Sequence, residues 1–253
     1  MSTDFTISFF YKQTNPGVQN YPCILNKRES FNSGSGWQVI LTSGNPEFSS
    51  SFSNKIIGKK INDALWHSVT IVVSRSGTAD STKIFVDGVL GEKTTANATA
   101  ITTLKPLTIG KVDDFPYNNA DFMMANLQIY KGVAFTNLEV AQYHSITNVN
   151  ILNMPHFDKL DGYWPGYEDV GTNRLTDFSK NNNDLIITGY YRWDSYSDLV
   201  SYFNPPIKDS FYKSVPNSVD LPFFIYQWFG MIPVASWGLD GKSWTPRLLV
   251  LTK

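Results

Sequence analysis

The sequence predicts an all-β protein in which antiparallel strands form a sandwich. Three observations lead to this fold class: apolar residues recur at every second position, clusters of turn-forming residues separate these runs, and helical periodicity is almost absent. With 253 residues, of which 42% are hydrophobic and 15% aromatic, the chain can bury one large core. Strands at this spacing are typical of antiparallel sandwiches and barrels.

The strands are expected where the alternation is regular. In residues 5–11 the odd positions are apolar, from Phe5 to Tyr11, so these side chains should share one face of a strand. The same pattern returns at 37–41, 69–73 and 127–129, and turn clusters occur at 32–36 and 43–46.

Two local motifs predict particular turns. Asp87 and Gly88 stand between two apolar runs, which predicts a type I′ hairpin because both central residues must adopt positive φ. Thr136 is followed three residues later by Glu139, the pattern of a capping box, which predicts the start of a short helix.

The composition argues against several classes of protein. The 21 basic and 22 acidic residues form no basic patch, so nucleic acid is not an expected partner. Cys23 is the one cysteine, which rules out an intramolecular disulfide and suggests a small core residue. The three histidines lack the paired spacing of metal ligands, so no structural zinc site is expected.

The sequence contains neither of the two common membrane signals. Its first residues have no basic region followed by an apolar one, so we expect no signal peptide and synthesis in the cytoplasm. The most apolar stretch, 221–235, is shorter than the roughly 20 residues that cross a bilayer, and two prolines interrupt it. Membrane insertion is therefore not expected.

Several short segments carry a resemblance to a known family. The opening strand at 5–9 is followed in order by segments at 66–73, 83–88, 107–110 and 125–130. In this order they resemble the laminin-G-like domains, which are concanavalin A-like jelly rolls. The resemblance extends to about Tyr143 and implies an antiparallel sandwich. This fold hosts lectins, adhesion modules, enzymes and structural coats, so the fold alone does not give the function.

One family segment occurs in an unusual place. Such domains begin with a Gly-Tyr-Trp-Pro strand and an Asp- and Asn-rich loop, but here only four residues precede Phe5. A close match follows instead at 162–184. The resemblance implies a circular permutation, in which residues 160–193 supply the usual first strand from the carboxyl side. Two alternatives stay open: the segment completes a neighbouring subunit's sandwich, or it opens a second, degenerate domain.

The expected organisation is therefore a sandwich at 1–193 and a different segment at 194–253. The latter is rich in aromatic residues and prolines, and prolines disfavour long helices and central strands, so an irregular segment is predicted. Aromatic surfaces depleted in charge are typical of protein interfaces. The candidate interface residues are Phe223, Phe224, Tyr226, Trp228, Phe229, Trp237 and Trp244.

A loop near the rim of the sandwich is the candidate ligand site. Family members often bind one calcium ion there through Asp and Asn oxygens, so the resemblance implies a candidate calcium or glycan loop, with an aromatic ring as a stacking platform. A solvated loop without a ligand is the simpler alternative. The loop residues are Asp113, Asp114, Tyr117, Asn118 and Asn119.

Catalytic residues are not expected. Glycosidases of this fold carry a pair of carboxylates on one strand, and that spacing is missing. No Gly-x-Ser-x-Gly motif of a nucleophilic serine occurs, and His67 is interpreted as structural. Apart from the calcium ion, no cofactor is expected.

Two functions of different classes follow. Laminin-G-like modules mostly work outside cells, yet no export signal or disulfide is visible, a conflict that a virion protein assembled in the host cytoplasm resolves. The leading hypothesis is an auxiliary (decoration) protein of a tailed-phage capsid, located on the capsid surface. Its partners would be the major capsid protein, other virion proteins or further copies of itself. The alternative is a carbohydrate-binding module of a phage fibre or adhesin, with surface glycans as ligands.

Overall fold

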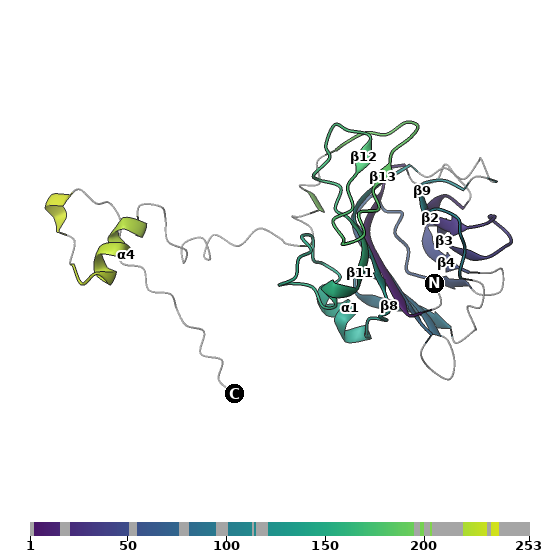
Figure 1. Ribbon diagram of the computed structural model, residues 1–253, viewed down its shortest axis with the longest axis horizontal. Coiled ribbons are helices and arrows are strands. Elements are labelled where there is room, and N and C mark those ends of the chain that lie inside the picture. Colours follow the sequence, from purple (N-terminus) through teal and green to yellow (C-terminus); the bar gives the residue numbers. More distant parts are fainter. Residues whose placement is uncertain are drawn as a thin grey trace. The chain divides into compact units, whose positions relative to one another are not determined.

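The computed structural model divides the chain into two compact units, Met1–Asn204 and Pro205–Lys253. The first unit contains a β-sandwich (Figure 1). The structure describes residues 3–15, 21–50, 55–75, 81–94, 101–112, 114, 121–194, 198–199, 203, 220–231 and 234–237.

Two antiparallel sheets form the sandwich, which confirms the predicted fold class (Figure 1). The larger sheet has six strands in the order β11-β10-β1-β6-β7-β8, and the smaller has five in the order β5-β4-β3-β2-β9. The strands of the larger sheet are β1 (Phe5–Gln13), β6 (His67–Ser74), β7 (Ser81–Val86), β8 (Val89–Thr94), β10 (Phe122–Lys131) and β11 (Leu160–Trp164). Those of the smaller are β2 (Cys23–Arg28), β3 (Gly36–Thr42), β4 (Asn45–Ser49), β5 (Lys55–Ile57) and β9 (Thr108–Ile109).

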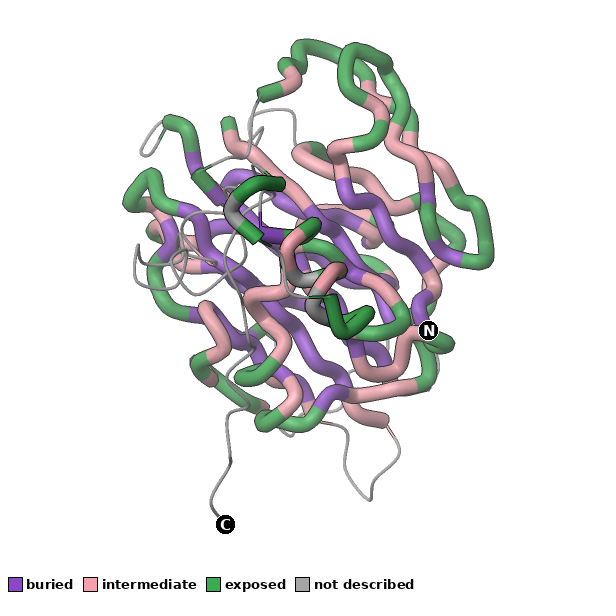
Figure 2. The backbone as a smooth tube through the Cα atoms, turned by 90° about the vertical axis from the view of Figure 1, so that its left-hand side faces the viewer, coloured by how far each residue is buried: buried purple, intermediate pink, exposed green. Residues whose placement is uncertain are grey.

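The main core lies between the sheets. The odd-numbered side chains of β1, from Phe5 to Tyr11, are buried in it, as the alternation predicts. The Trp37 ring on β3 stacks near Phe5 at 6.4 Å and near Phe48 at 6.1 Å, so one indole connects the two sheets. Figure 2 shows the buried residues running along the strands, with exposed residues mainly in the connections.

The outer face of the six-stranded sheet is covered. The helix α1 (Asn137–Tyr143) and the segments on either side of it place Phe135, Val140 and Val149 against Tyr130 of β10. A second cluster on this face joins Phe10 to apolar side chains near residue 199. These two clusters form a second buried apolar layer on the outer face of the six-stranded sheet.

Both predicted turn motifs are confirmed. Asp87 and Gly88 have φ values of 51° and 72°, the positive values that a type I′ hairpin requires. At the start of α1, the Glu139 N–H donates to the Thr136 hydroxyl at 3.2 Å, and the Thr136 N–H donates to the Glu139 carboxylate at 2.7 Å. This reciprocal pair is the capping box.

The strand β11 forms one edge of the larger sheet. It pairs antiparallel with β10, with Leu127 opposite Trp164 and Gln128 opposite Tyr163. β10 in turn pairs with β1, so the Gly-Tyr-Trp-Pro segment lies beside the strand next to the opening strand of the same chain. This is the pairing that the permutation hypothesis requires. The permutation itself, and the boundary at residue 193, stay predictions.

The Asp- and Asn-rich loop after β11 is organised by one buried carboxylate. Asp177 accepts hydrogen bonds from the backbone N–H groups of Tyr163, Ser179 and Asn183, each at 2.8 Å. The Ser179 hydroxyl adds a fourth at 2.9 Å. This part of the family motif therefore holds the loop against β11. The loop carries the short strands β12 (Arg174–Leu175) and β13 (Leu185–Ile186), and a 3-10 turn (Phe157–Lys159) precedes β11.

Contacts with the sandwich continue past residue 193. The Asp198 carboxylate accepts from the Lys12 ammonium at 2.5 Å and from the Trp66 indole N–H at 3.0 Å. The Phe203 ring lies 4.8 Å from the Phe10 ring. Asp198, Leu199 and Phe203 thus belong with the sandwich, and the first compact unit ends at Asn204.

The second unit contains a helix, which corrects the expectation of a wholly irregular segment. α4 (Asp220–Trp228) is followed by a 3-10 turn (Ala235–Trp237), and the Tyr226 and Trp237 rings lie 5.1 Å apart. Pro222 is compatible with α4 because it stands in the first turn, where its missing N–H removes no helical hydrogen bond. Within the described ranges, no helix is long and apolar enough to cross a membrane.

Candidate functional site

A cavity of about 230 Å³ lies on the outer face of the five-stranded sheet. Its floor follows from the pleat of β3: Val39 and Leu41 point into the core, so Gln38, Ile40 and Thr42 point outward. We call this cavity the sheet groove; its lining residues are Tyr21, Arg28, Phe31, Asn32, Gln38, Ile40, Thr42, Glu47, Ser49 and Lys55.

The floor of the sheet groove contains an amide that the protein only half satisfies. Gln38 is 3% exposed, and its Nε2 donates to the Phe31 carbonyl at 3.1 Å. Its Oε1 has no hydrogen-bond partner within the described part of the chain. A buried acceptor without a partner destabilises a protein by about 1–3 kcal/mol. A ligand hydroxyl donating to this oxygen would recover that free energy.

Two buried charged side chains flank the amide. The Glu47 carboxylate accepts from the Thr42 hydroxyl at 2.8 Å, which fixes its position. The Arg28 guanidinium donates to the carbonyls of Phe31 and Gly34 at 3.2 and 3.4 Å, so it holds the loop after β2. Burial lowers the pKa of Arg28, while the nearby Asp114 carboxylate acts in the opposite direction. The groove is therefore lined by a positively charged hydrogen-bond donor, the Arg28 guanidinium, and a negatively charged acceptor, the Glu47 carboxylate.

One wall of the sheet groove is aromatic. The Tyr21 and Phe31 rings lie 6.4 Å apart with an interplanar angle of 54°. Tyr21 is 46% exposed, so its ring is accessible. Aromatic rings of this kind offer apolar faces beside the polar floor.

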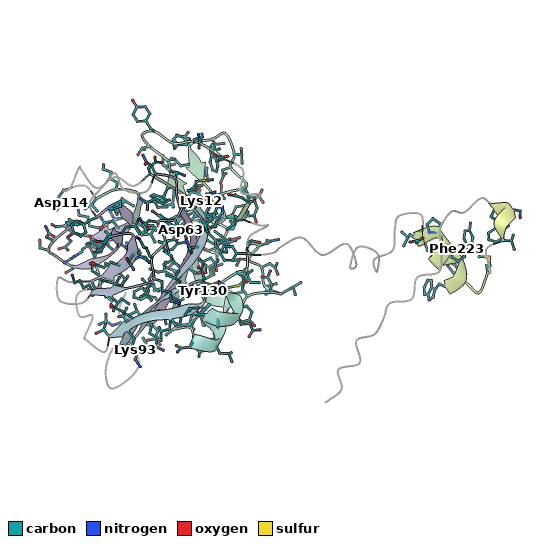
Figure 3. The ribbon with its side chains drawn as sticks, turned by 180° about the vertical axis from the view of Figure 1, so that it is seen from behind. Lys12, Asp63, Lys93, Asp114, Tyr130 and Phe223 are labelled. Carbon is teal, nitrogen blue, oxygen red and sulfur yellow. The ribbon has the colours of Figure 1, made fainter. Side chains whose placement is uncertain are left out.

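The predicted calcium or glycan loop is only partly described. Asp114 accepts from the Ser30 hydroxyl at 2.5 Å and from the Phe31 N–H at 3.1 Å (labelled in Figure 3). Burial by itself would raise the pKa of Asp114, but these hydrogen bonds outweigh it and hold the pKa below its usual range. Asp114 thus ties the Phe31 loop to the rim of the sandwich.

The remaining residues of that loop lie outside the described ranges, and calcium binding stays a prediction. Among the residues that the structure describes, no group of three or more His, Cys, Asp or Glu side chains could hold a metal ion. The undescribed loop residues are Asp113, Tyr117, Asn118 and Asn119.

The predicted C-terminal interface residues lie mainly on α4. Trp228 and Phe229 are 79% and 66% exposed and their rings are 5.5 Å apart. Trp237 is also exposed, whereas Phe223 (Figure 3) and Tyr226 are half-buried. The Phe224 side chain and Trp244 are outside the described set, and the interface stays a prediction.

His67 belongs to a buried polar network. Its two ring nitrogens lie 2.8 Å from the Asp87 carboxylate and 2.9 Å from that of Asp63. Burial alone would lower the pKa of His67, but the two carboxylates outweigh it and raise the pKa. The Asp87 carboxylate also accepts from the Ser68 N–H at 2.9 Å. The network joins the start of β6 to the β7–β8 turn.

Most of the sheet groove could not be foreseen from the sequence. Only the turn cluster at 32–36 suggests a loop that could reach a glycan, and Asn32 does line the groove. Gln38, Thr42 and Glu47 have the alternating polar pattern of any outward sheet face, so the pattern alone does not distinguish a groove from a solvated surface.

The sequence of the sandwich matches a known family. Residues 1–141, more than half of the chain, match the family model described as the concanavalin A-like lectin/glucanases superfamily. The chain belongs to this superfamily. Residues 151–245 match a second family, described as a domain of unknown function, DUF4983. No protein in a search of curated sequences is significantly similar.

Solved structures share the fold at low sequence identity. A "putative carbohydrate binding protein" from Bacteroides ovatus aligns with a TM-score of 0.54 at 11% identity, over 74% of this chain and 54% of that one. The Ruminococcus gnavus IT-sialidase CBM40 bound to α2,3-sialyllactose aligns with a TM-score of 0.43 at 13% identity, over 55% and 81%. The binding domain of Paraclostridial Mosquitocidal Protein 1 aligns with a TM-score of 0.45 at 17% identity, over 56% and 37%.

The names of these structures refer to binding domains. The chain spans 37% of the length of the mosquitocidal binding domain and 54% of the Bacteroides ovatus protein. The alignment with the Bacteroides ovatus protein shows a shared fold, which agrees with the superfamily assignment.

Proposed function

We propose that this chain is a carbohydrate-binding module, rather than an enzyme, and that it binds a sugar in the sheet groove. One observation carries the proposal: the buried Gln38 amide, with its unpartnered oxygen, lines the same cavity as the Tyr21 and Phe31 rings. A pyranose presents hydroxyl groups at its edge and C–H groups on its faces. It therefore requires fixed polar groups together with an apolar surface, as the sheet groove offers.

The polar groups of the sheet groove suit hydroxyl ligands in particular. A hydroxyl both donates and accepts, and the groove offers acceptors on Gln38 and Glu47 and a donor on the Lys55 ammonium. The Glu47 carboxylate is held by the Thr42 hydroxyl before any ligand arrives, so little ordering is needed on binding.

Membership of a superfamily of lectins and glucanases supports the proposal. The Bacteroides ovatus protein, whose name refers to carbohydrate binding, shares the fold. A glucanase requires two carboxylates that flank the glycosidic bond to be cleaved. Among the described residues that line the sheet groove, Glu47 is the only carboxylate, so binding is the better-supported activity.

The direct test is a glycan array probed with the full chain, with and without calcium. Affinity for the best glycan is then measured for Gln38→Leu and Tyr21→Ala. Each change should weaken binding by about tenfold, because it removes a hydrogen-bond acceptor or a stacking face.

Lys93→Ala is the matched control, since Lys93 (Figure 3) is an exposed residue of β8 in the other sheet. It should leave the affinity unchanged. Absence of any glycan ligand would contradict the proposal, and so would wild-type affinity in both groove variants. A requirement for calcium would instead favour the loop at residues 113–119 as the site.

Capsid decoration is a second candidate, favoured by the exposed rings of Trp228 and Phe229 on α4. None of the structures named above carries a name that refers to a virion. Because Leu199 and Phe203 pack with the sandwich, the informative deletion removes residues 205–253 only. On this hypothesis the full chain should co-purify with phage particles and the truncated chain should not. Equal incorporation of both chains would exclude anchoring by this segment.

A further inference from the structure

A second opening lies at the edge of the six-stranded sheet, where β10 extends beyond β11. β11 pairs with β10 from Leu127 to Tyr130, and the Asn126 N–H donates to the Pro165 carbonyl at 3.0 Å. Residues 122–125 of β10 continue past this point. Among the described residues, they are paired with a strand only on the β1 side.

The register with β1 shows which backbone groups face this edge. The Thr14 N–H donates to the Asp121 carbonyl at 3.2 Å, so that pair is a hydrogen-bonded one. Bonded and non-bonded pairs alternate along an antiparallel ladder. The pairs Phe122–Gln13 and Met124–Tyr11 are therefore non-hydrogen-bonded pairs. The N–H and C=O groups of Phe122 and Met124 point away from β1.

These four backbone groups have no hydrogen-bond partner within the described part of the chain. The N–H of Asn126, two residues after Met124, also points away from β1. It has a partner, because it donates to the Pro165 carbonyl of the segment that follows β11. An unpaired strand edge of this kind is a template for another strand.

A cavity of about 190 Å³ adjoins this edge. Side chains from both faces of β10 line it, Met124 from the core face and Met123 from the outer face. We call it the edge cleft and define it by Trp66, Phe122, Met124, Trp164, Tyr191 and Trp193.

The polar atoms of the three tryptophans are already used. The indole N–H of Trp66 donates to Asp198 at 3.0 Å, that of Trp164 to the Asn183 carbonyl at 3.0 Å, and that of Trp193 to the Thr172 carbonyl at 2.9 Å. The rings therefore offer the ligand apolar surface without donors. The Arg192 and Asp194 side chains, which also line the cleft, form an ion pair at 3.0 Å, so their charges compensate each other.

From these observations we infer that the edge cleft binds an extended peptide segment of another polypeptide as an added β-strand. The peptide backbone pairs with Phe122 and Met124, and uncharged apolar side chains enter the cleft. This is recognition by β-augmentation, in which main-chain hydrogen bonds supply affinity and pockets for alternate side chains supply specificity. A sugar fits this site less well, because the backbone N–H and C=O groups of Phe122 and Met124 have the spacing of a β-ladder, which another strand matches.

The test uses the full chain and an acetylated, amidated probe peptide, Thr-Val-Tyr-Val-Thr. Amide exchange of the protein is followed by NMR at millimolar peptide concentration. Exchange of the Phe122 and Met124 amides should slow on addition of the peptide, because both become hydrogen-bonded. The control is the same peptide N-methylated at its three internal residues, which keeps the side chains but removes the donors. It should bind at least about tenfold more weakly.

A pair of variants tests the same bonds from the protein side. Met124→Pro removes an N–H that points to the open edge and leaves the ladder with β1 intact, whereas Met124→Leu keeps the N–H. Binding of the probe should fall about tenfold in the first and stay within about twofold in the second. The melting temperature reports whether each variant folds.

Three outcomes would overturn the inference: no slowing of exchange, equal binding of the N-methylated peptide, or full binding by a folded Met124→Pro chain. If Met124→Pro does not fold, the inference is tested by comparing how tightly the unmodified chain binds the probe peptide and its N-methylated form. Glycan binding by the sheet groove is an independent property, because Gln38 does not line the edge cleft. Gln38→Leu should therefore leave peptide binding unchanged.

Discussion

The two sheets of the sandwich share one core but differ on their outer faces. The six-stranded sheet is covered outside by α1, by the segment after it and by Leu199 and Phe203, so Val140 and Leu199 are buried there. The five-stranded sheet has a smaller apolar cluster of Cys23, Ile40 and Val112 on its outer face. Beside it lies the sheet groove, where Gln38 and Glu47 are buried near exposed Tyr21. A sandwich needs only its inner faces for stability. One sheet of this chain uses most of its outer face for further packing, and the outer face of the other carries the groove that we propose as the sugar site.

The largest effect is expected where the two sheets meet. Trp37→Ala should lower the free energy of unfolding by about 3–5 kcal/mol, because the fully buried indole stacks near Phe5 of one sheet and Phe48 of the other. Urea unfolding measures it. Leu65→Ala, at a position 48% exposed, is the control and should change the value by less than about 1 kcal/mol. Similar values for both variants would contradict a shared core.

A smaller effect is expected at the loop that follows β11. Asp177→Ala should lower the free energy of unfolding by about 2–3 kcal/mol, since three backbone donors and the Ser179 hydroxyl lose their acceptor. Asp158→Ala, which removes an exposed pair with Lys159, should leave the free energy of unfolding nearly unchanged. Amide exchange of Tyr163 should accelerate only in the first variant. Unchanged exchange would mean that β11 is held by its pairing with β10 alone.

The network around His67 should make stability depend on pH. The pKa of His67 is raised above its ordinary value of about 6.5 in the folded chain, because Asp87 and Asp63 outweigh the effect of burial. Its stabilising contribution is therefore present below about pH 6.5 and is lost as the pH rises through the folded-state pKa.

His67→Gln should remove this contribution, so its deficit in unfolding free energy should be larger at about pH 6 than at about pH 9. Burial lowers the pKa of His144, which acts with the opposite sign. The comparison is therefore made in a His144→Gln background. A deficit that grows with rising pH would show that the protonated form of His67 does not stabilise the fold.

The smallest effect is expected on the open face. Lys55→Ala changes an exposed side chain at the rim of the sheet groove and should alter the free energy of unfolding by about 0.5 kcal/mol or less. Val140→Ala on the covered face should lower it by about 1–3 kcal/mol, because it leaves a space beneath α1. Equal effects in urea unfolding would remove the contrast between the two faces.

Local signals in the sequence predict much of the fold. The period of two in β1, the Asp87–Gly88 turn and the Thr136 cap are each encoded by neighbouring residues. The helix α4 escapes such a prediction because a proline usually ends a helix, although Pro222 is tolerated in the first turn. The packing of Leu199 and Phe203 could not be predicted because their partners, such as Phe10 and Trp66, are distant in sequence.

The sequence by itself determined that this chain is an antiparallel sandwich, since periodicity and turn chemistry act over a few residues. The superfamily followed from the resemblance of its ordered segments to a known family. Only the tertiary structure formed the two cavities that we propose as binding sites. Gln38 becomes part of a groove because the loop carrying Phe31 folds over its strand. Met124 lies beyond the end of β11, because the pairing of β10 with β11 extends only from Leu127 to Tyr130 among the described residues. Alternation assigns a residue to a face of a sheet, but its neighbours across that face come from segments far along the chain.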